Sequence, residues 1–98
     1  MKTYYVYIVQ CTDNSYYTGV TNDIERRIAE HNQGEDKQAY TYRKRPVKLV
    51  WHEYYNDINQ GIEKEKQIKG WNRKKKEALI NNDFDQLVAL SNLKNNSK

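Results

Sequence analysis

The chain has 98 residues, which suit a single domain, and its 17 Lys and Arg residues against 13 Asp and Glu residues give a net charge of +4. No run of 18 apolar residues is present, which excludes a membrane-spanning helix. Cys11 is the single cysteine, which excludes an intrachain disulfide and a cysteine-based zinc site. Nine tyrosines argue against a disordered chain. These features favour a cytoplasmic globular domain.

The positive charge is concentrated in two segments. Residues 37–52 carry five basic and no acidic residues, and residues 64–76 carry seven basic residues and one acidic residue. Such blocks favour a surface for a polyanion, and tyrosines among the basic residues suit base stacking as well as phosphate contacts. The alternative is a solvated charged face that keeps a small domain soluble. We predict these nucleic-acid-binding residues: Tyr40, Tyr42, Arg43, Lys44, Arg45, Lys66, Lys69, Arg73 and Lys74.

The first part of the chain predicts a β-hairpin. Residues 4–9 are rich in β-branched and aromatic side chains, residues 12–15 have turn chemistry, and residues 16–20 form the returning arm. Aromatic or apolar residues occupy both faces of the first arm, so we expect it to be a central strand.

A helix is predicted to follow the hairpin. Asn22 is its expected N-cap, with Glu25 three residues later, and Gly34 belongs to the stop signal. Arg27 and His31 are four residues apart, so both side chains should project from the same face.

The remaining pattern predicts one more strand and three helices. The strand is expected at residues 47–51, followed by a helix capped by Asn56 or Asp57, a helix capped by Asn72 that ends at Ile80, and a short apolar helix at residues 84–90. Glu65 falls on the apolar face of the first of these helices, where a carboxylate is anomalous.

The predicted order is therefore β-β-α-β-α-α-α. This order predicts an α+β fold in which helices flank a small, mostly antiparallel three-stranded sheet. We expect residues 1–80 to form the main body, and residues 81–98 to add a C-terminal helix and a frayed tail, from residue 92 onward, to the same single domain.

Five polar side chains on these elements can support phosphodiester hydrolysis: Tyr7, Tyr17, Arg27, His31 and Glu65. A hairpin places the two phenols side by side, and a carboxylate suits Mg²⁺, which prefers oxygen ligands. A guanidinium binds phosphate oxygens, and a phenol or imidazole can move a proton if its pKa is suitable.

These elements resemble the GIY-YIG nuclease superfamily over about residues 3–80. Tyr5-Val6-Tyr7 and Tyr17-Thr18-Gly19 look like the paired hairpin signature, residues 21–32 look like the first helix, and residues 62–69 look like the helix that carries the metal ligand. The similarity is greatest to the small stand-alone bacterial members of uncharacterised function.

The resemblance implies roles for the hairpin residues. Tyr7 matches the general base or water-positioning tyrosine, Tyr17 matches the tyrosine near the scissile phosphate, and Gly19 matches the glycine at which the backbone packs closely. Tyr5 replaces a frequent glycine and Thr18 a frequent isoleucine of the signature.

The resemblance also implies roles on the helices. Arg27 matches the catalytic arginine, His31 matches a histidine of several members, and Glu65 matches the glutamate that binds one divalent cation, expected to be Mg²⁺. Some members use an additional Asn, and Asn72, the nearby candidate here, suits a helix cap better.

Three functions are compatible with these patterns. The first is a metal-dependent endonuclease that acts on nucleic acid, with DNA favoured over RNA, no membrane association, and a protein partner as one source of specificity. The second is a DNA- or RNA-binding module that keeps the fold and the basic surface without turnover. The third is a protein-interaction domain whose basic blocks meet an acidic partner.

Overall fold

The computed structural model describes residues 3–96 and confirms the α+β class. A three-stranded antiparallel sheet has the order β2-β1-β3, with β1 spanning Tyr4–Gln10, β2 Tyr16–Thr21 and β3 Lys48–Tyr55. The helices are α1 (Ile24–Gln33), α2 (Ile58–Lys69), α3 (Arg73–Ile80) and α4 (Phe84–Asn96), and a short 3-10 turn, η1, covers Tyr42–Lys44. The element order is the one that the sequence predicts.

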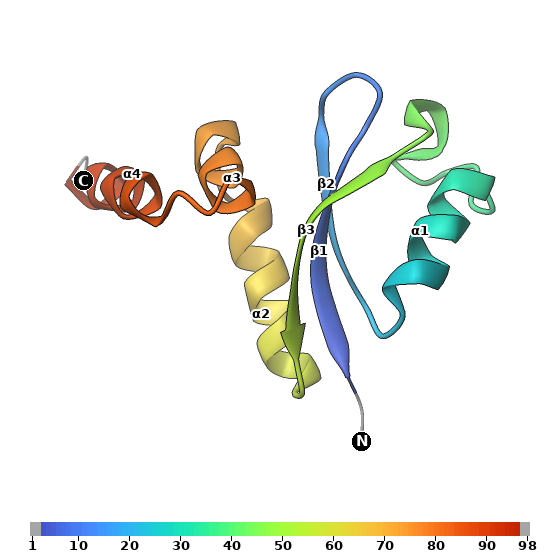
Figure 1. The fold of residues 1–98 in the computed structure, drawn as a ribbon, viewed down its shortest axis with the longest axis horizontal. Helices are drawn as coiled ribbons and strands as arrows, with labels where there is room; N and C mark the ends of the chain where they lie inside the picture. The colour runs from blue at the N-terminus through green and yellow to red at the C-terminus, as the bar shows by residue number, and fades with distance from the viewer. Residues whose placement is uncertain (1–2, 97–98) are drawn as a thin grey trace.

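The central position of β1 explains its apolar residues on both faces. Val6 and Ile8 pack with Ile68 and Leu79 on one side of the sheet, which α2 and α3 cover. Tyr7 and Val9 face the other side, where Ile28 of α1 packs against them. Figure 1 shows α1 on one side of the sheet and α2 on the other, with α3 next to α2 and α4 farthest from the sheet. The sheet therefore presents Tyr7 to α1.

Helix α1 begins and ends at local signals. Its N-cap is Asp23, whose side chain accepts a hydrogen bond from the backbone N–H of Arg26. The prediction of Asn22 as the cap was wrong by one residue, because the side chain that reaches the N–H three residues onward is that of Asp23. Gly34 ends the helix with a φ of 70°, in the left-handed region that glycine adopts without strain.

Two other predicted boundaries were wrong. β3 runs from Lys48 to Tyr55, beyond the predicted end at residue 51, because its pairing with β1 continues, apart from a register shift between Ile8 and Val9, up to the partners Tyr4 and Tyr55. Helix α4 continues to Asn96, although a frayed tail was predicted from residue 92, and residues 97 and 98 lie outside the described residues. The caps at Asp57 and Asn72 are confirmed.

No helix within residues 3–96 is long and apolar enough to cross a membrane.

Candidate active site

The hairpin places Tyr7 and Tyr17 on the same face of the sheet. Tyr7 pairs with Gly19 and Val9 pairs with Tyr17, and directly opposed residues share a face. The centres of the two tyrosine rings are 6.5 Å apart. Tyr7 is buried and Tyr17 is partly buried, so the two rings meet at the edge of the packed interior.

Gly19 makes room for the Tyr7 ring. A Cβ atom at position 19 would lie 2.6 Å from Cζ and 2.9 Å from Cε1 of Tyr7, and closer still to the hydroxyl. These separations are shorter than carbon atoms in contact, which are about 3.5–4.0 Å apart. The ring therefore lies directly over the backbone of β2.

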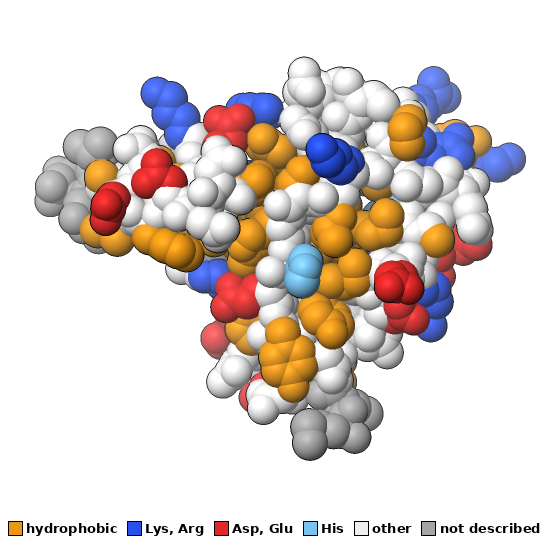
Figure 2. Space-filling model, in the orientation of Figure 1, with side chains coloured by type: hydrophobic (Ala, Val, Ile, Leu, Met, Phe, Trp, Pro, Cys, Tyr) orange, Lys and Arg blue, Asp and Glu red, His pale blue; other side chains and the backbone are white. Residues whose placement is uncertain are grey.

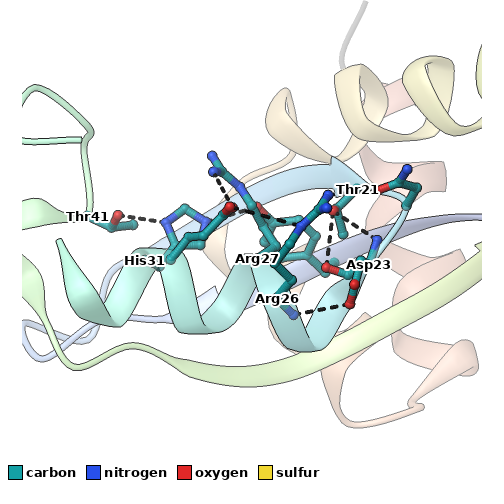
Figure 3. Close-up of polar contacts among 9 residues, drawn as sticks. Thr21, Asp23, Arg26, Arg27, His31 and Thr41 are labelled. Carbon is teal, nitrogen blue, oxygen red and sulfur yellow. Dashed lines mark hydrogen bonds and ion pairs between the residues drawn. The ribbon is translucent and has the colours of Figure 1, made fainter. Parts of the chain in front are cut away.

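Helix α1 brings Arg27 and His31 to this face. His31 is buried, and its Nε2 lies 3.0 Å from the Tyr7 hydroxyl, while its Nδ1 lies 2.9 Å from Oγ1 of Thr41. Figure 3 shows Arg27 and His31 on the same side of α1, with Thr41 beside the imidazole. Arg27 interacts with the Tyr7 hydroxyl and forms an ion pair of 3.3 Å with Glu30.

Burial dominates the electrostatics of these groups. It raises the pKa of Tyr7 to about 12, against a smaller lowering by the hydrogen bond from Arg27. Burial also lowers the pKa of His31, and the positive charge of Arg27 lowers it further. Burial acts to lower the pKa of Arg27, but Tyr7 and Glu30 outweigh it and raise that pKa. At neutral pH, Tyr7 keeps its proton and His31 is mainly uncharged.

Glu65 enters from α2. Its side chain is 17% exposed and forms an ion pair of 3.6 Å with Lys69. The Nζ atom of Lys69 lies 5.8 Å from the centre of the Tyr17 ring, so this part of α2 reaches the edge strand β2. The negative charge of Glu65 contributes to the raised pKa of Tyr7. The charge of the Glu65 carboxylate therefore acts on the Tyr7 hydroxyl.

The carboxylate suits a cation that is shared with the substrate. Among residues 3–96, no group of three or more His, Cys, Asp or Glu side chains could hold a metal ion. Mg²⁺ keeps several water molecules and is often bound by one or two carboxylates together with substrate phosphates. Glu65 fits that kind of site.

The first basic block lies partly against the site. Tyr40 stacks on Tyr17 with ring centres 6.1 Å apart, and Nζ of Lys44 lies 3.8 Å from the centre of the Tyr40 ring. Lys44 is also 3.1 Å from a carboxylate oxygen of Asp13, so part of its charge is neutralised there. A hydrogen bond from Lys44 lowers the pKa of Tyr40.

The other residues of this block face a separate groove. Arg45 lies over the Tyr42 ring, with 4.4 Å between the guanidinium carbon and the ring centre. These two residues line an open groove together with Asn32, Arg43 and Pro46.

The second basic block divides in the same way. Lys69 lies near Tyr17, whereas Arg73 lies over the ring of Tyr16 and pairs with Glu77 at 3.2 Å. Lys66 and Lys74 are exposed on α2 and α3.

Sequence patterns did not indicate Thr41. Its hydroxyl contacts His31 across ten residues of chain, and its side chain is fully buried. It stands alone between two tyrosines, with no spacing that marks it.

The chain is similar to known proteins over most of its length. A family model described as the GIY-YIG catalytic domain matches residues 3–78. A UPF0213 protein of Haloquadratum walsbyi is 44% identical over 82 residues, which cover 84% of this chain and 91% of that protein. A UPF0213 protein of Staphylococcus saprophyticus is 44% identical over 80 residues, which cover 82% and 96% of the two chains.

Two solved structures have a similar fold. The NMR structure of a UPF0213 protein from Bacillus halodurans has a TM-score of 0.53 and 37% identity, and the match covers 81% of this chain and 83% of that chain. The NMR structure of a protein from E. faecalis has a TM-score of 0.59 and 32% identity, with 86% and 88% coverage.

Proposed function

The chain belongs to the GIY-YIG nuclease superfamily, and from this premise we propose that it is an endonuclease that hydrolyses DNA phosphodiester bonds with one divalent cation, Mg²⁺. The observation that carries the proposal is the position of the Tyr7 hydroxyl, which contacts the imidazole of His31 and the guanidinium of Arg27. The Tyr7 phenol thus lies next to a proton acceptor, and the charges of Arg27 and Glu65 both act on it.

Arg27 would bind the scissile phosphate, and Glu65 would hold the cation. The guanidinium donates to the phosphate oxygens and offsets the negative charge that builds up in the transition state. The cation, when bound, supplies charge stabilisation at the phosphate oxygens and favours ionisation of water.

Tyr7 and His31 move the proton of the attacking water. In the tautomer that carries its proton on Nδ1, His31 donates to Thr41 and leaves Nε2 to accept from Tyr7. With a pKa of about 12, Tyr7 is almost never a phenolate at neutral pH, so it cannot act as a base by itself. Tyr7 therefore passes its own proton to His31 while its oxygen takes a proton from water. The water oxygen bonds to phosphorus, the bond to the leaving oxygen breaks, and solvent protonates the leaving oxygen.

The basic residues guide the strand to this point. Lys69 and the Tyr40 ring lie at Tyr17 and are placed to contact the nucleotides next to the cleaved bond. Tyr42, Arg43 and Arg45 contact the strand at the separate groove that they line. Further phosphate contacts fall to Lys44, Lys66, Arg73 and Lys74. A partner protein is a further source of specificity in this proposal.

A cleavage assay with matched variants tests the proposal. Labelled single-stranded, duplex and branched DNA are incubated with Mg²⁺ or with EDTA. We expect cleavage with Mg²⁺ only, and a loss of about 10²–10³-fold for Arg27→Ala, the size of effect seen when one charge-stabilising donor is removed. Arg26→Ala, on the same helix but 61% exposed, is the control and should cleave normally. Cleavage that survives both EDTA and Arg27→Ala would refute the proposal.

One observation favours a second function, a binding module without turnover. Glu65 already has a cationic partner in Lys69, and the described residues offer no additional carboxylate to form a group of three metal ligands. This function predicts binding of DNA or RNA that weakens with salt, no cleavage with any divalent cation, and no effect of Glu65→Ala on affinity. Charge reversal at Arg43, Lys44 and Arg45 should then abolish binding.

A further inference from the structure

An exposed aromatic cluster lies on the sheet beside the candidate active site. The Tyr5 ring is 6.1 Å from the ring of His52 and 6.1 Å from that of Tyr54, and it meets each edge to face. Tyr54 is 50% exposed, and His52 is also exposed. Figure 2 shows hydrophobic side chains gathered around an exposed histidine in the middle of the viewed face. The proton-transfer steps proposed above use none of these three rings.

Strand register makes the cluster continuous with the site. Tyr5 and Tyr7 are two residues apart on β1 and so point to the same face. His52 is the β3 partner of Tyr7, and Tyr54 is the partner of Tyr5. Opposed side chains begin about 5 Å apart. The cluster therefore extends the face of the site from Tyr7 outward to β3, which is an edge strand.

The chemistry of the cluster fits a nucleobase. Aromatic side chains on a sheet stack on the bases of single-stranded nucleic acid, and this stacking depends little on the nucleotide sequence. The Tyr5 ring meets the His52 and Tyr54 rings edge to face, so the three ring planes are not parallel. A base can therefore approach ring faces that have different orientations. A base inside a duplex is already stacked and paired, so it has no free face to offer. A cluster of this kind suits an unpaired base better than a paired one.

We propose that Tyr5, His52 and Tyr54 form a stacking site for an unpaired nucleobase that flanks the scissile phosphodiester. The substrate is then DNA that is single-stranded next to the cleaved bond. The position of the scissile bond rests on the proposed function, whereas binding of the unpaired base does not. Tyr7 and His52 are opposed in the sheet, so a single DNA strand can contact both the stacking site and the candidate active site.

Binding measured in EDTA tests the stacking site separately from cleavage. Fluorescence anisotropy gives the affinity for a labelled single-stranded oligonucleotide and for the duplex of the same sequence. We expect Tyr54→Ala to weaken single-strand binding about 5- to 150-fold, which corresponds to the loss of one stacked base. Duplex affinity should not change. His52→Ala should act in the same direction, and Tyr54→Phe should retain single-strand affinity because the ring remains.

Phe84→Ala is the matched control. Phe84 is an exposed aromatic residue, 60% exposed, but it lies on α4, away from the sheet. It should bind both oligonucleotides like the unmodified chain. Three results would overturn the proposal: no single-strand binding, equal losses on single strand and duplex, or an unchanged affinity of Tyr54→Ala. Sedimentation that shows a dimer dissociated by Tyr54→Ala would also overturn it, because a second copy would then cover the cluster.

The two proposals can fail separately. If no Mg²⁺-dependent cleavage is found but Tyr54→Ala selectively weakens single-strand binding, the nuclease function fails and the stacking site remains. If Mg²⁺-dependent cleavage is found and Tyr54→Ala leaves single-strand affinity unchanged, the stacking site fails and the nuclease function remains.

Discussion

Replacing Gly19 with alanine should destabilise the fold by overpacking. The added Cβ would lie 2.6 Å from Cζ of Tyr7, about 1 Å less than a normal carbon contact. Tyr7 cannot move away freely, because its ring is 1% exposed and its hydroxyl is 3.0 Å from Nε2 of His31. Extra carbon atoms in a tightly packed interior cost about 1–3 kcal/mol. We expect Gly19→Ala to lower the free energy of unfolding by that amount.

Urea unfolding followed by circular dichroism measures this change, and Gly61→Ala is the control. A Cβ at position 61 would meet Val20 at 3.6 Å and Val6 at 3.8 Å, which are ordinary contacts, and the residue lies within α2. Alanine favours a helix over glycine, so Gly61→Ala should raise the free energy of unfolding by about 0.4–1 kcal/mol. Unfolding of Gly19→Ala at the same urea concentration as the unmodified chain would show that the Tyr7 ring tolerates the added Cβ atom.

Three further predictions concern the Tyr7–His31 pair and the hairpin. Tyr7→Phe should reduce the cleavage rate about 10²–10⁴-fold, because the phenol that moves the proton is lost. It should also lower the free energy of unfolding by about 1–3 kcal/mol, because Nε2 of His31 loses its buried partner. Cleavage kinetics and urea unfolding measure the two effects, and an unchanged cleavage rate would contradict the proton-transfer role of Tyr7. Because folding lowers the pKa of His31 below its ordinary value of 6.5, its contribution to stability is present above that pH and is lost as the pH falls. Between pH 7.5 and 5.5 the unmodified chain should therefore lose more free energy of unfolding, measured in urea, than His31→Gln. Equal losses by the two proteins would contradict this prediction. Hydrogen bonds from Ser15, and then Lys44, lower the pKa of Asp13 from 3.8 to about 2. The stability that this shift contributes disappears as the pH falls through that range. Asp13→Asn should therefore remove this part of the acid dependence of the Tm, and an unchanged acid dependence would count against the prediction.

The order of elements could be predicted because local patterns determine it. The apolar residues on both faces of β1 predicted a central strand, which the order β2-β1-β3 confirms. Gly34, Asp57 and Asn72 mark helix ends through hydrogen bonds to residues close in sequence. The end of β3 could not be predicted in this way, because distant pairing with β1 sets it and the polar residues His52 and Glu53 interrupt the apolar pattern.

The candidate site was predictable where its residues follow strand or helix periodicity. Tyr7 and Tyr17 share a sheet face by register, and Arg27 and His31 share a helix face by their spacing. Thr41 and the stacking of Tyr40 on Tyr17 depend on how the segment between α1 and β3 folds back, and no periodicity records that path. Helix periodicity marked Glu65 as a carboxylate on an apolar face, but it could not predict how Glu65 lies relative to Tyr7, because α2 packs on the opposite side of the sheet from α1.

Cleavage of labelled DNA by Glu65→Gln tests whether hydrolysis depends on the carboxylate that would hold the cation, with Glu63→Gln as its control. Both residues lie on α2, but Glu63 is exposed, whereas Glu65 is mostly buried and in electrostatic contact with Tyr7. We expect Mg²⁺-dependent cleavage by the unmodified chain and by Glu63→Gln. We expect a loss of at least about 10²-fold for Glu65→Gln, the scale of removing a group that stabilises charge in the transition state. Equal cleavage by the two variants, or no cleavage of any DNA by the unmodified chain with Mg²⁺, would show that Glu65 has no such role.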